Sequence, residues 1–287
     1  MRLPAARPAV PAGLAGRRTG LPAFDRWGMA GPAALLGLFL GLPVVVLVVR
    51  AALGGALGRA IAAPAVLGAL GLSLATTAAS LVLTVALGFP FAHLLARRPP
   101  RGAALLETLV DLPVVLPPSV AGLALLLVFG REGLLGGSLD ALGVAIPFTT
   151  GAVILAQTFV SAPLFVRSAR AGLAAVDPAA EDAARVDGAG EAAVLRWVTV
   201  PLAAPYLASG IVMAWARSLG EFGATIMFAG NIAGRTQTLP LVVYAEFQGG
   251  ALDAAIAASA MLAVAAFAVL VAVRLLGGRA TDLRSVA

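Results

Sequence analysis

Six stretches of this 287-residue chain are apolar over about the length that crosses a lipid bilayer, and no other feature constrains the fold as strongly. A membrane-spanning helix needs about 20 mostly apolar residues, because each rises about 1.5 Å across a hydrocarbon core of about 30 Å. The third stretch can be extended back to Leu105, and Ser161 and Pro163 interrupt the short fourth one. The chain is therefore predicted to be an all-α integral membrane protein with about six spanning helices. The predicted spans cover residues 32–49, 66–95, 112–129, 151–166, 200–228 and 254–273.

The composition excludes the common soluble classes. Sixty per cent of the residues are hydrophobic and only 12% are charged, whereas a soluble domain carries about 25% charged residues. So few polar side chains cannot cover a surface that faces water. A soluble globular protein, a disordered chain and a collagen-like fibre are all excluded.

Three residue types that are absent or nearly absent limit the chemistry. The chain has no Cys, no Lys and a single His, His93. It therefore cannot form disulfides, thiolate nucleophiles or metal sites with several His ligands. The phosphate-binding loop of many ATPases needs a Lys, so ATP hydrolysis by this chain is not expected. We predict that the chain is not an enzyme and holds no cofactor and no metal.

The basic residues alternate between the two sides of the predicted spans. Fifteen of the 20 Arg residues lie in the two terminal tails and in the links between spans two and three and between spans four and five. Arg-rich segments stay in the cytoplasm, so both termini are predicted to be cytoplasmic. This topology explains the net charge of +6 better than nucleic-acid binding does, and we expect a lipid partner and no nucleic acid.

The same distribution divides the chain into three regions. Residues 1–29 are rich in Pro and Arg without an apolar run and are predicted to be a flexible cytoplasmic tail. Residues 30–275 form the transmembrane domain, and residues 276–287 form a cytoplasmic C-terminal tail. Glu107 and Asp111, at the cytoplasmic entrance of the third span, are expected to face interfacial water.

Five of the 14 acidic residues gather in the predicted cytoplasmic loop at about 167–199. Asp177-Pro178 has the sequence of a helix N-cap followed by Pro in the first turn. Residues 179–186 have high helix propensity, and Gly188 and Gly190 then interrupt the helix. This pattern predicts two short helices joined at a glycine turn, which we call the elbow. Its acidic residues are Asp177, Glu181, Asp182, Asp187 and Glu191.

The elbow resembles the EAA loop of ABC importer permeases. The pattern of that family is EAA, three residues, Gly, nine residues and I-x-L-P, and every spacing is matched here. The departures are Asp for Glu at 182 and Val for the apolar residues at 198 and 200. The resemblance implies a type I ABC importer permease fold and a loop that docks onto an ATPase subunit. The matching residues are Asp182, Ala183, Ala184, Gly188, Val198 and Pro201, and Glu181 supplies a second acidic side chain beside them.

Two later segments resemble the molybdate permeases within that family. They are residues 216–225, which read ARSLGEFGAT, and residues 229–240, which read AGNIAGRTQTLP. The resemblance extends over roughly residues 60–275 and leaves the N-terminal tail outside. Its signature residues are Gly220, Phe222, Gly223, Asn231, Gly234, Thr236 and Pro240.

The resemblance implies a function and an assembly. The chain would be the permease subunit of an ATP-driven molybdate importer and would form the pathway of the oxyanion. It would pair with a second copy in a two-fold homodimer and bind two cytosolic ABC ATPase subunits, which carry ATP and Mg²⁺. An extracytoplasmic molybdate-binding protein would deliver the substrate. The location implied is the plasma (inner) membrane of a prokaryote, with several passes.

Arg217 and Glu221 form the only opposite-charge pair deep in a predicted span. Charged residues there are costly and usually face a cavity or each other, and positions i and i+4 share one helix face. Two interpretations remain open. The pair is either a structural ion pair between helices or part of a pathway in which Arg217 helps a dianion pass and Glu221 prevents tight binding. In the second case Ser218 and Thr225 would offer hydroxyl donors.

Other functions compete with this interpretation. The same machinery could carry sulfate, thiosulfate or tungstate. A secondary transporter or channel would work without an ATPase and is expected to show inverted repeats, which the sequence lacks. A membrane-embedded enzyme would need catalytic groups, and the chain has one His, no Cys and no pair of carboxylates within a span.

Overall fold

The computed structural model describes residues 23–55, 58, 61 and 63–282 of the chain. Over these residues the chain forms helices and turns, without a strand. Residues 1–22 of the predicted N-terminal tail and residues 283–287 of the predicted C-terminal tail lie outside the described residues. The chain divides into two units, Met1–Val48 and Val49–Ala287, and each is described by itself.

The first unit contains most of helix α1 (Ala23–Leu53), which begins inside the predicted 1–29 tail. Pro32 and Pro43 lie within this helix. Its apolar side chains are largely exposed, Phe39 to 72% and Leu38 to 60%. Exposed apolar side chains around a long helix fit a lipid environment or contact with another chain.

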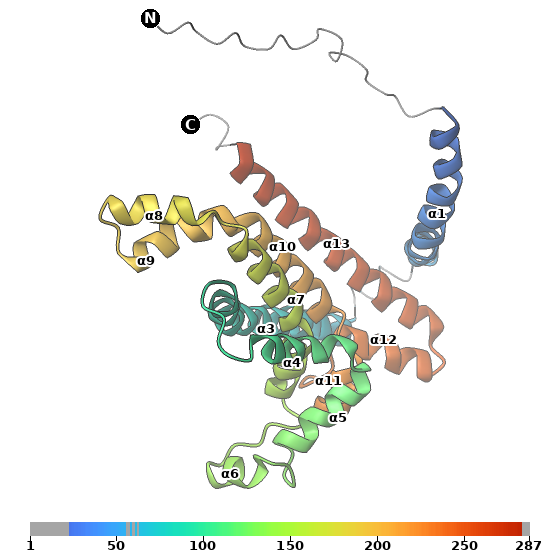
Figure 1. Ribbon diagram of the computed structural model, residues 1–287. Helices are drawn as coiled ribbons and strands as arrows, with labels where there is room; N and C mark the ends of the chain where they lie inside the picture. The colour runs from blue at the N-terminus through green and yellow to red at the C-terminus, as the bar shows by residue number, and fades with distance from the viewer. Residues whose placement is uncertain (1–22, 56–57, 59–60, 62, 283–287) are drawn as a thin grey trace, which may run out of the picture. The chain divides into compact units, whose positions relative to one another are not determined.

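The second unit contains the other helices of the described chain (Figure 1). Most of them pack side by side, and the short helices α8 and α9 lie at one end of the group, with α6 at another (Figure 1). The helices are α3 (Pro64–Arg97), α4 (Ala103–Val115), α5 (Pro118–Phe129), α6 (Gly136–Ala141), α7 (Thr150–Ala174), α8 (Pro178–Val186), α9 (Glu191–Val194), the π-helix η1 (Leu195–Thr199), α10 (Val200–Leu219), α11 (Gly223–Ala229), α12 (Leu239–Gln248) and α13 (Leu252–Asp282).

The predicted number of spans is confirmed for the described residues. Five helices are long and apolar enough to cross a membrane, or six if the bent pair α4 and α5 counts as one span. Helix α13 continues to Asp282, beyond the predicted start of the C-terminal tail at residue 276.

The third predicted span, residues 112–129, is wrong as a single helix. The chain bends by 118° between α4 and α5. Leu116 and Pro117 between them are extended, with ψ of 135° and 136°. The reason is local, because the ring of a proline disfavours the helical conformation of the residue before it. Two consecutive prolines, Pro117 and Pro118, therefore end α4 and start α5.

The fourth predicted span differs in the opposite direction. Helix α7 runs unbroken from Thr150 to Ala174, with Pro163 inside it, where residues 151–166 were predicted as a short and interrupted span. A proline within a span is tolerated where neighbouring helices cover the freed backbone group, and Pro163 is buried. Residues 167–174 of the predicted loop therefore continue this helix.

Small residues let α3, α7 and α10 approach closely. A Cβ added at Gly172 of α7 would lie 2.4 Å from Cβ of Tyr206 in α10, and one at Gly88 of α3 would lie 3.0 Å from the ring of Phe165 in α7. Close approach of this kind gives helices the van der Waals contact that holds them together in lipid. The core between these helices is formed by Ala92, Phe165, Val166, Ala169, Leu173, Val176, Ala203 and Ala214.

A second core joins α5, α7 and α11. Its centre is apolar and fully buried, with Phe228 at 0% exposure. Gly122 of α5 lies against the backbone of α11, because an added Cβ would be 2.6 Å from the Ala224 carbonyl oxygen and 2.7 Å from Cβ of Met227. The buried members are Ala121, Leu125, Ala152, Val153, Ala156, Val160, Ala224, Phe228 and Ala229.

The close packing at Gly122 can be tested by a substitution that adds one methyl group. Gly122→Ala is expected to lower the free energy of unfolding by about 1–3 kcal/mol, because overpacking would force α5 and α11 apart. Gly71→Ala in α3 is the matched control, since an added Cβ there meets nothing within 4 Å. The control is expected to be neutral or stabilising by up to about 1 kcal/mol. Unfolding of both purified variants in detergent measures the difference, and equal stability would contradict close packing at Gly122.

Candidate functional site

Two regions of the second unit carry most of the functional residues predicted from sequence. One is the elbow, which comprises α8, the turn at Gly188, α9 and η1. The other is the helix break between α10 and α11, around Gly220 and Glu221. Helix α10 connects the two regions, because it begins directly after η1 and ends at the break.

The start of the elbow is capped as predicted. Asp177 precedes α8, and its carboxylate oxygen Oδ1 accepts a hydrogen bond of 2.9 Å from the Ala179 N–H. Pro178 occupies the first turn, where its missing N–H costs nothing. The cap satisfies one of the backbone donors that every helix start leaves free.

The end of α8 explains the spacing between Ala184 and Gly188. Gly188 has φ of +91°, a conformation that glycine adopts without strain. The Ala189 N–H bonds the Ala184 carbonyl at 2.9 Å, and the Gly188 N–H bonds the Arg185 carbonyl at 3.0 Å. This pair of bonds is the Schellman motif. Gly188 is therefore the residue that turns the chain from α8 into α9.

Arg185 clamps the two arms of the elbow across this turn. Its guanidinium binds Glu191 through two hydrogen bonds of 2.8 and 3.2 Å, and Asp182 through one of 2.8 Å. The hydrogen bonds from Arg185 lower the pKa of Glu191 below its ordinary value of 4.5. The Arg185–Glu191 pair therefore contributes fully above pH 4.5, and its contribution is lost as the pH falls through the lowered pKa of Glu191.

The two neighbouring acidic residues of the elbow have different surroundings. The side chain of Glu181 is only 9% exposed and contacts Arg97 and Thr199. The side chain of Asp182 is 70% exposed. Ala183 is also exposed, so the outer side of α8 at the motif is accessible, whereas Glu181 faces the rest of the chain.

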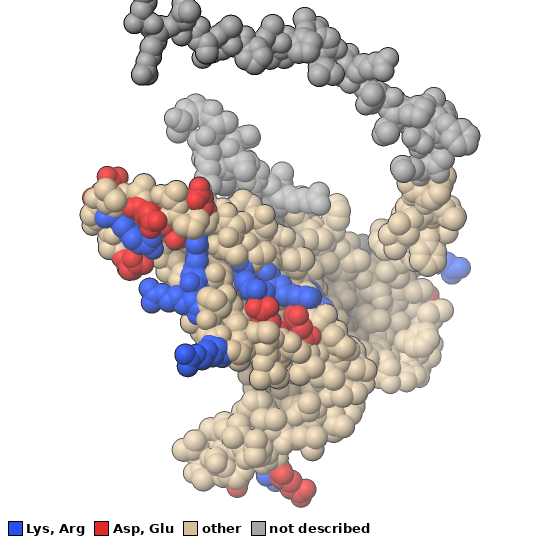
Figure 2. Space-filling model, in the orientation of Figure 1, with Lys and Arg blue, Asp and Glu red and all other residues tan. Residues whose placement is uncertain are grey.

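Charged side chains gather at this end of the molecule. Figure 2 shows positive and negative groups over α8, α9 and the neighbouring helix ends, whereas much of the remaining face is uncharged. Two of the ion pairs join α4 to α7. Arg167 pairs with Asp111 at 3.1 Å and Arg170 with Glu107 at 2.9 Å. Glu107 and Asp111 are therefore only partly exposed to solvent, and sequence analysis had not identified their Arg partners.

The fifth predicted span, residues 200–228, is wrong as a single helix. Helix α10 ends at Leu219, and the short α11 begins at Gly223. The carboxylate of Glu221 lies in the break and is 1% exposed. Its Oε1 accepts a hydrogen bond of 2.7 Å from the Ala224 N–H, which caps α11, and its Oε2 accepts one of 2.5 Å from Arg217.

The Arg217–Glu221 pair is thus within one chain segment and not between distant helices. Arg217 remains 34% exposed while its partner is buried. One nitrogen of the guanidinium donates to Glu221, and part of the Arg217 side chain remains accessible. The geometry gives Glu221 a structural role at the break and leaves Arg217 accessible.

The two hydroxyl residues predicted near Arg217 are buried. Ser218 shares a hydrogen bond of 2.6 Å with Ser80 of α3. Thr225 is 0% exposed and packs within α11, and its hydroxyl has no hydrogen-bond partner among the described residues. Ser218 therefore joins α10 to α3.

The segment after α11 is held by Thr236. Its hydroxyl accepts a hydrogen bond of 2.9 Å from the Ile232 N–H and lies 3.3 Å from the Gly230 carbonyl, to which it donates. Gly230 and Gly234 have positive φ, and Asn231 is exposed. Thr236 and the two glycines thus fix the shape of the loop. The remaining signature residues are Phe222, whose ring centroid lies 4.9 Å from that of Tyr244, Gly223, which touches Pro118, and Pro240 in the first turn of α12.

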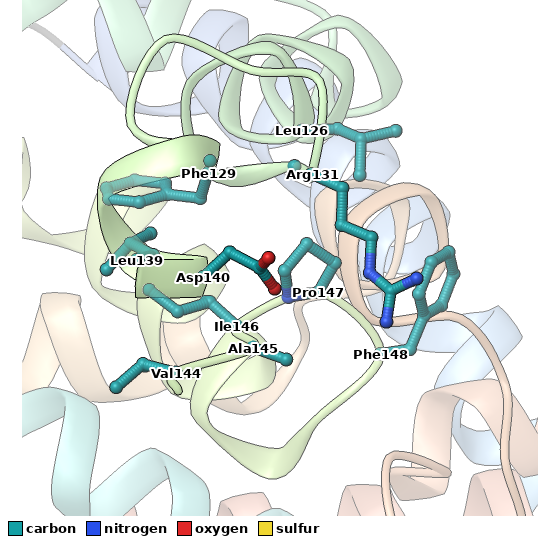
Figure 3. A pocket seen from close by; sticks show the side chains of 12 residues that line it. Leu126, Phe129, Arg131, Leu139, Asp140, Val144, Ala145, Ile146, Pro147 and Phe148 are labelled. Carbon is teal, nitrogen blue, oxygen red and sulfur yellow. The ribbon is translucent and has the colours of Figure 1, made fainter. Parts of the chain in front are cut away.

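A cavity of about 380 Å³ lies at the loop around α6 (Figure 3). Phe129, Ile146 and Phe148 contribute to a mainly apolar lining, and Arg131 and Asp140 are the charged residues. Such a lining offers an oxyanion no set of converging donors. Among the described residues, no group of three His, Asp or Glu side chains is arranged to hold a metal ion.

The family described as "Binding-protein-dependent transport system inner membrane component" matches residues 84–282. The "Molybdenum transport system permease protein ModB" of Mycobacterium tuberculosis is 48% identical over 196 residues, covering 68% of this chain and 74% of that protein. The ModB protein of Escherichia coli K12 is 44% identical over 179 residues, covering 61% and 78%.

Solved structures give the same fold. A bacterial ABC transporter involved in the import of the acidic polysaccharide alginate superposes with a TM-score of 0.72. The superposition covers 89% of this chain and 96% of that chain, at 18% identity. The all-α type I importer fold predicted from the resemblance is therefore confirmed.

The cap at the helix break is testable through Glu221. Glu221→Ala is expected to lower the free energy of unfolding by about 1.5–3 kcal/mol, because hydrogen bonds to a charged group are worth about that much. Glu221→Gln keeps an oxygen for the Ala224 N–H and is expected to lose less. Chemical unfolding in detergent measures both, with Glu132→Ala at an exposed acid as control, expected within about 0.5 kcal/mol of the parent. Equal losses in the Ala and Gln variants would argue against the cap.

Proposed function

The chain belongs to the family of binding-protein-dependent transport system inner membrane components, and we propose that it is the permease subunit of an ATP-driven molybdate importer. The observation that supports molybdate as the substrate is the identity of 44–48% with molybdenum transport permeases of two bacteria. The oxyanion crosses the membrane along this subunit, and ATP is hydrolysed with Mg²⁺ by a partner.

The elbow is the surface that binds the ATPase. Its support is the match to the EAA spacing together with the geometry that this spacing produces. Asp182 and Ala183 are exposed on α8, and Gly188 holds the turn that presents them. Val198 and Pro201 lie where the elbow passes through η1 into α10. Two ATPase subunits bind a homodimer of the permease, one to each elbow.

Arg217 is the residue that contacts the oxyanion during its passage. Its side chain is partly exposed although it lies in the last turn of an apolar helix, and Glu221 neutralises part of its charge. A transport site must bind an ion weakly enough to release it. Arg217 with its carboxylate partner meets this need better than an unpaired Arg would.

The orientation follows from the Arg distribution. The elbow and both termini lie in the cytoplasm, and the loop around α6 lies outside, where a molybdate-binding protein delivers the anion. A related structure is described as a bacterial alginate ABC transporter in complex with a periplasmic protein bound to an alginate pentasaccharide. That assembly is the type of arrangement we propose here, in the inner membrane of a prokaryote.

The proposal is tested by co-purifying the chain with the candidate ATPase and measuring ATP hydrolysis. Addition of the binding protein loaded with molybdate is expected to stimulate hydrolysis, and the unloaded binding protein is expected to stimulate it less. Loading with sulfate or tungstate tests the selectivity in the same assay. Absence of a stable complex with the ATPase would contradict the proposed function.

The docking role of the elbow is tested at its glycines. Gly188→Val is expected to weaken ATPase binding about tenfold, because a branched residue at φ of +91° costs on the order of 1–3 kcal/mol and moves α8. Gly190→Ala is the matched control. Gly190 has φ of −71° and open space around a new Cβ, so ATPase binding is expected to be unchanged. If Gly188→Val bound the ATPase normally, the elbow would not be the docking surface.

The pathway role is tested at Arg217. Arg217→Ala is expected to lower molybdate uptake about tenfold or more, since a charge-assisted contact is worth about 1.5–3 kcal/mol, while the complex with the ATPase still forms. Arg217→Lys is expected to retain part of the uptake. Arg101→Ala, at an exposed residue in the link before α4, is the control for loss of one Arg. Unchanged uptake by Arg217→Ala would exclude the pathway role.

A further inference from the structure

We propose that Glu181 is the positioning residue that makes the elbow move as one body with the end of α3 and the start of α10, an inference that rests on the proposed function. Asp182 and its neighbours bind the ATPase from outside. Glu181, one residue earlier, fastens α8 to the transmembrane helices from inside. The inference rests on the contacts that Glu181 makes with Arg97 and Thr199.

One carboxylate oxygen joins three segments of the chain. Oε1 of Glu181 accepts a hydrogen bond of 2.7 Å from Arg97, in the last turn of α3, and another of 2.7 Å from the hydroxyl of Thr199 in η1. Oε2 lies 3.8 Å from Arg185. The side chains of Glu181 and Arg97 are 9% and 17% exposed, so water screens the pair only weakly.

Arg97 also binds a fourth segment of the chain, the residues just after α7. Its guanidinium also lies 3.4 Å from the carbonyl oxygen of Val176, to which it donates, just after the end of α7. The buried network therefore holds α8 against the ends of α3 and α7 and against the turn that starts α10. The other ion pairs of the elbow join Arg185 to Asp182 and Glu191, which belong to the elbow itself.

The contact with Thr199 lies at an unusual point of the backbone. Residues 195–199 form a π-helical turn, in which the Val200 N–H bonds the carbonyl of Leu195. Turns of this kind occur mostly singly and frequently at functional sites. Thr199 also donates to the Val194 carbonyl at 3.4 Å. The carboxylate of Glu181 thus binds the π-helical turn from which α10 continues.

Glu181 and Asp182 therefore have different roles, although they are adjacent in the sequence. Displacement of α8 by the ATPase carries Arg97 and Thr199 with it, and hence α3 and α10, as long as Glu181 is charged and in place. Without that carboxylate the ATPase still binds the outer face of α8. Its movement then ends in the elbow and no longer reaches the transmembrane helices.

The experiment compares Glu181→Gln, Arg97→Gln and the double variant in the reconstituted complex with the ATPase and the molybdate-loaded binding protein. The measured quantity is molybdate transported per ATP hydrolysed. Each single variant is expected to bind the ATPase as the parent does. The molybdate transported per ATP hydrolysed is expected to fall about fivefold or more, the scale of a typical coupling between sites. Because the two residues act as a unit, the double variant is expected to lose no more than the worse single variant.

Arg98→Gln is the matched control, since it removes the neighbouring exposed charge without touching the contacts of Glu181. Unchanged transport per ATP in Glu181→Gln would overturn the inference. Loss of ATPase binding in that variant would also overturn it, because Glu181 would then belong to the docking surface. A double variant that loses the product of the two single losses would also overturn it, because the two residues would then act separately.

A second measurement separates this inference from the proposed function. The chain has no Cys, so spin labels can be placed by Ala179→Cys on α8 and Leu94→Cys on α3, both at exposed positions. The parent is expected to give one narrow distance distribution and Glu181→Gln a broad one. A distribution that stays narrow overturns the inference whatever the substrate is, whereas a parent complex without molybdate-dependent hydrolysis overturns the proposed function alone.

Discussion

The hydroxyl groups along one face of α3 hold much of the second unit together. Ser73, Ser80 and Thr84 are each 0–1% exposed. In lipid, apolar side chains gain little by leaving one hydrocarbon environment for another, so packing and hydrogen bonds between helices must supply the attraction. Ser73 accepts from the Leu239 N–H at 2.7 Å, and Ser80 bonds Ser218 at 2.6 Å. The same face, through Thr84, lies 3.5 Å from the hydroxyl of Ser161 in α7.

The chain tolerates two broken spans because residues at each break satisfy or remove the backbone donors there. A break within a membrane protein exposes backbone groups that water cannot reach, and other parts of the protein must satisfy them. At the break after α10, the Glu221 carboxylate bonds the Ala224 N–H, while Ser218, immediately before the break, is anchored to α3. At the break after α4, two prolines remove two donors that would otherwise need partners. Each break is therefore stabilised by a residue at its edge.

The sequence was informative where the structure depends on local geometry. The Asp177 cap and the turn at Gly188 depend on residues within six positions of each other, and both were predicted. Hydropathy also identified the apolar segments, but it does not distinguish a straight helix from a bent one. Pro117 and Pro118 do predict a kink in the third span, although not a bend of 118°, whereas the break at Gly220 was missed. The partners of Glu181 were not predictable, because Arg97 is 84 positions away and its placement depends on how α3 packs. The Ser80–Ser218 contact, 138 positions apart, was missed for the same reason.

Helix α10 gives the two candidate regions a physical connection under the proposed function. It runs from Val200, next to the Thr199 contact of Glu181, to Leu219, next to the Arg217–Glu221 pair. At about 1.5 Å per residue, its 20 residues span on the order of 30 Å, the thickness of a bilayer core. Small residues and the Ser218 bond fix its middle and far end to α3 and α7, so a rotation at the elbow cannot be absorbed along the helix without disturbing that packing. Displacement of the elbow by the ATPase would therefore also move Arg217, because both regions are joined by one continuous helix.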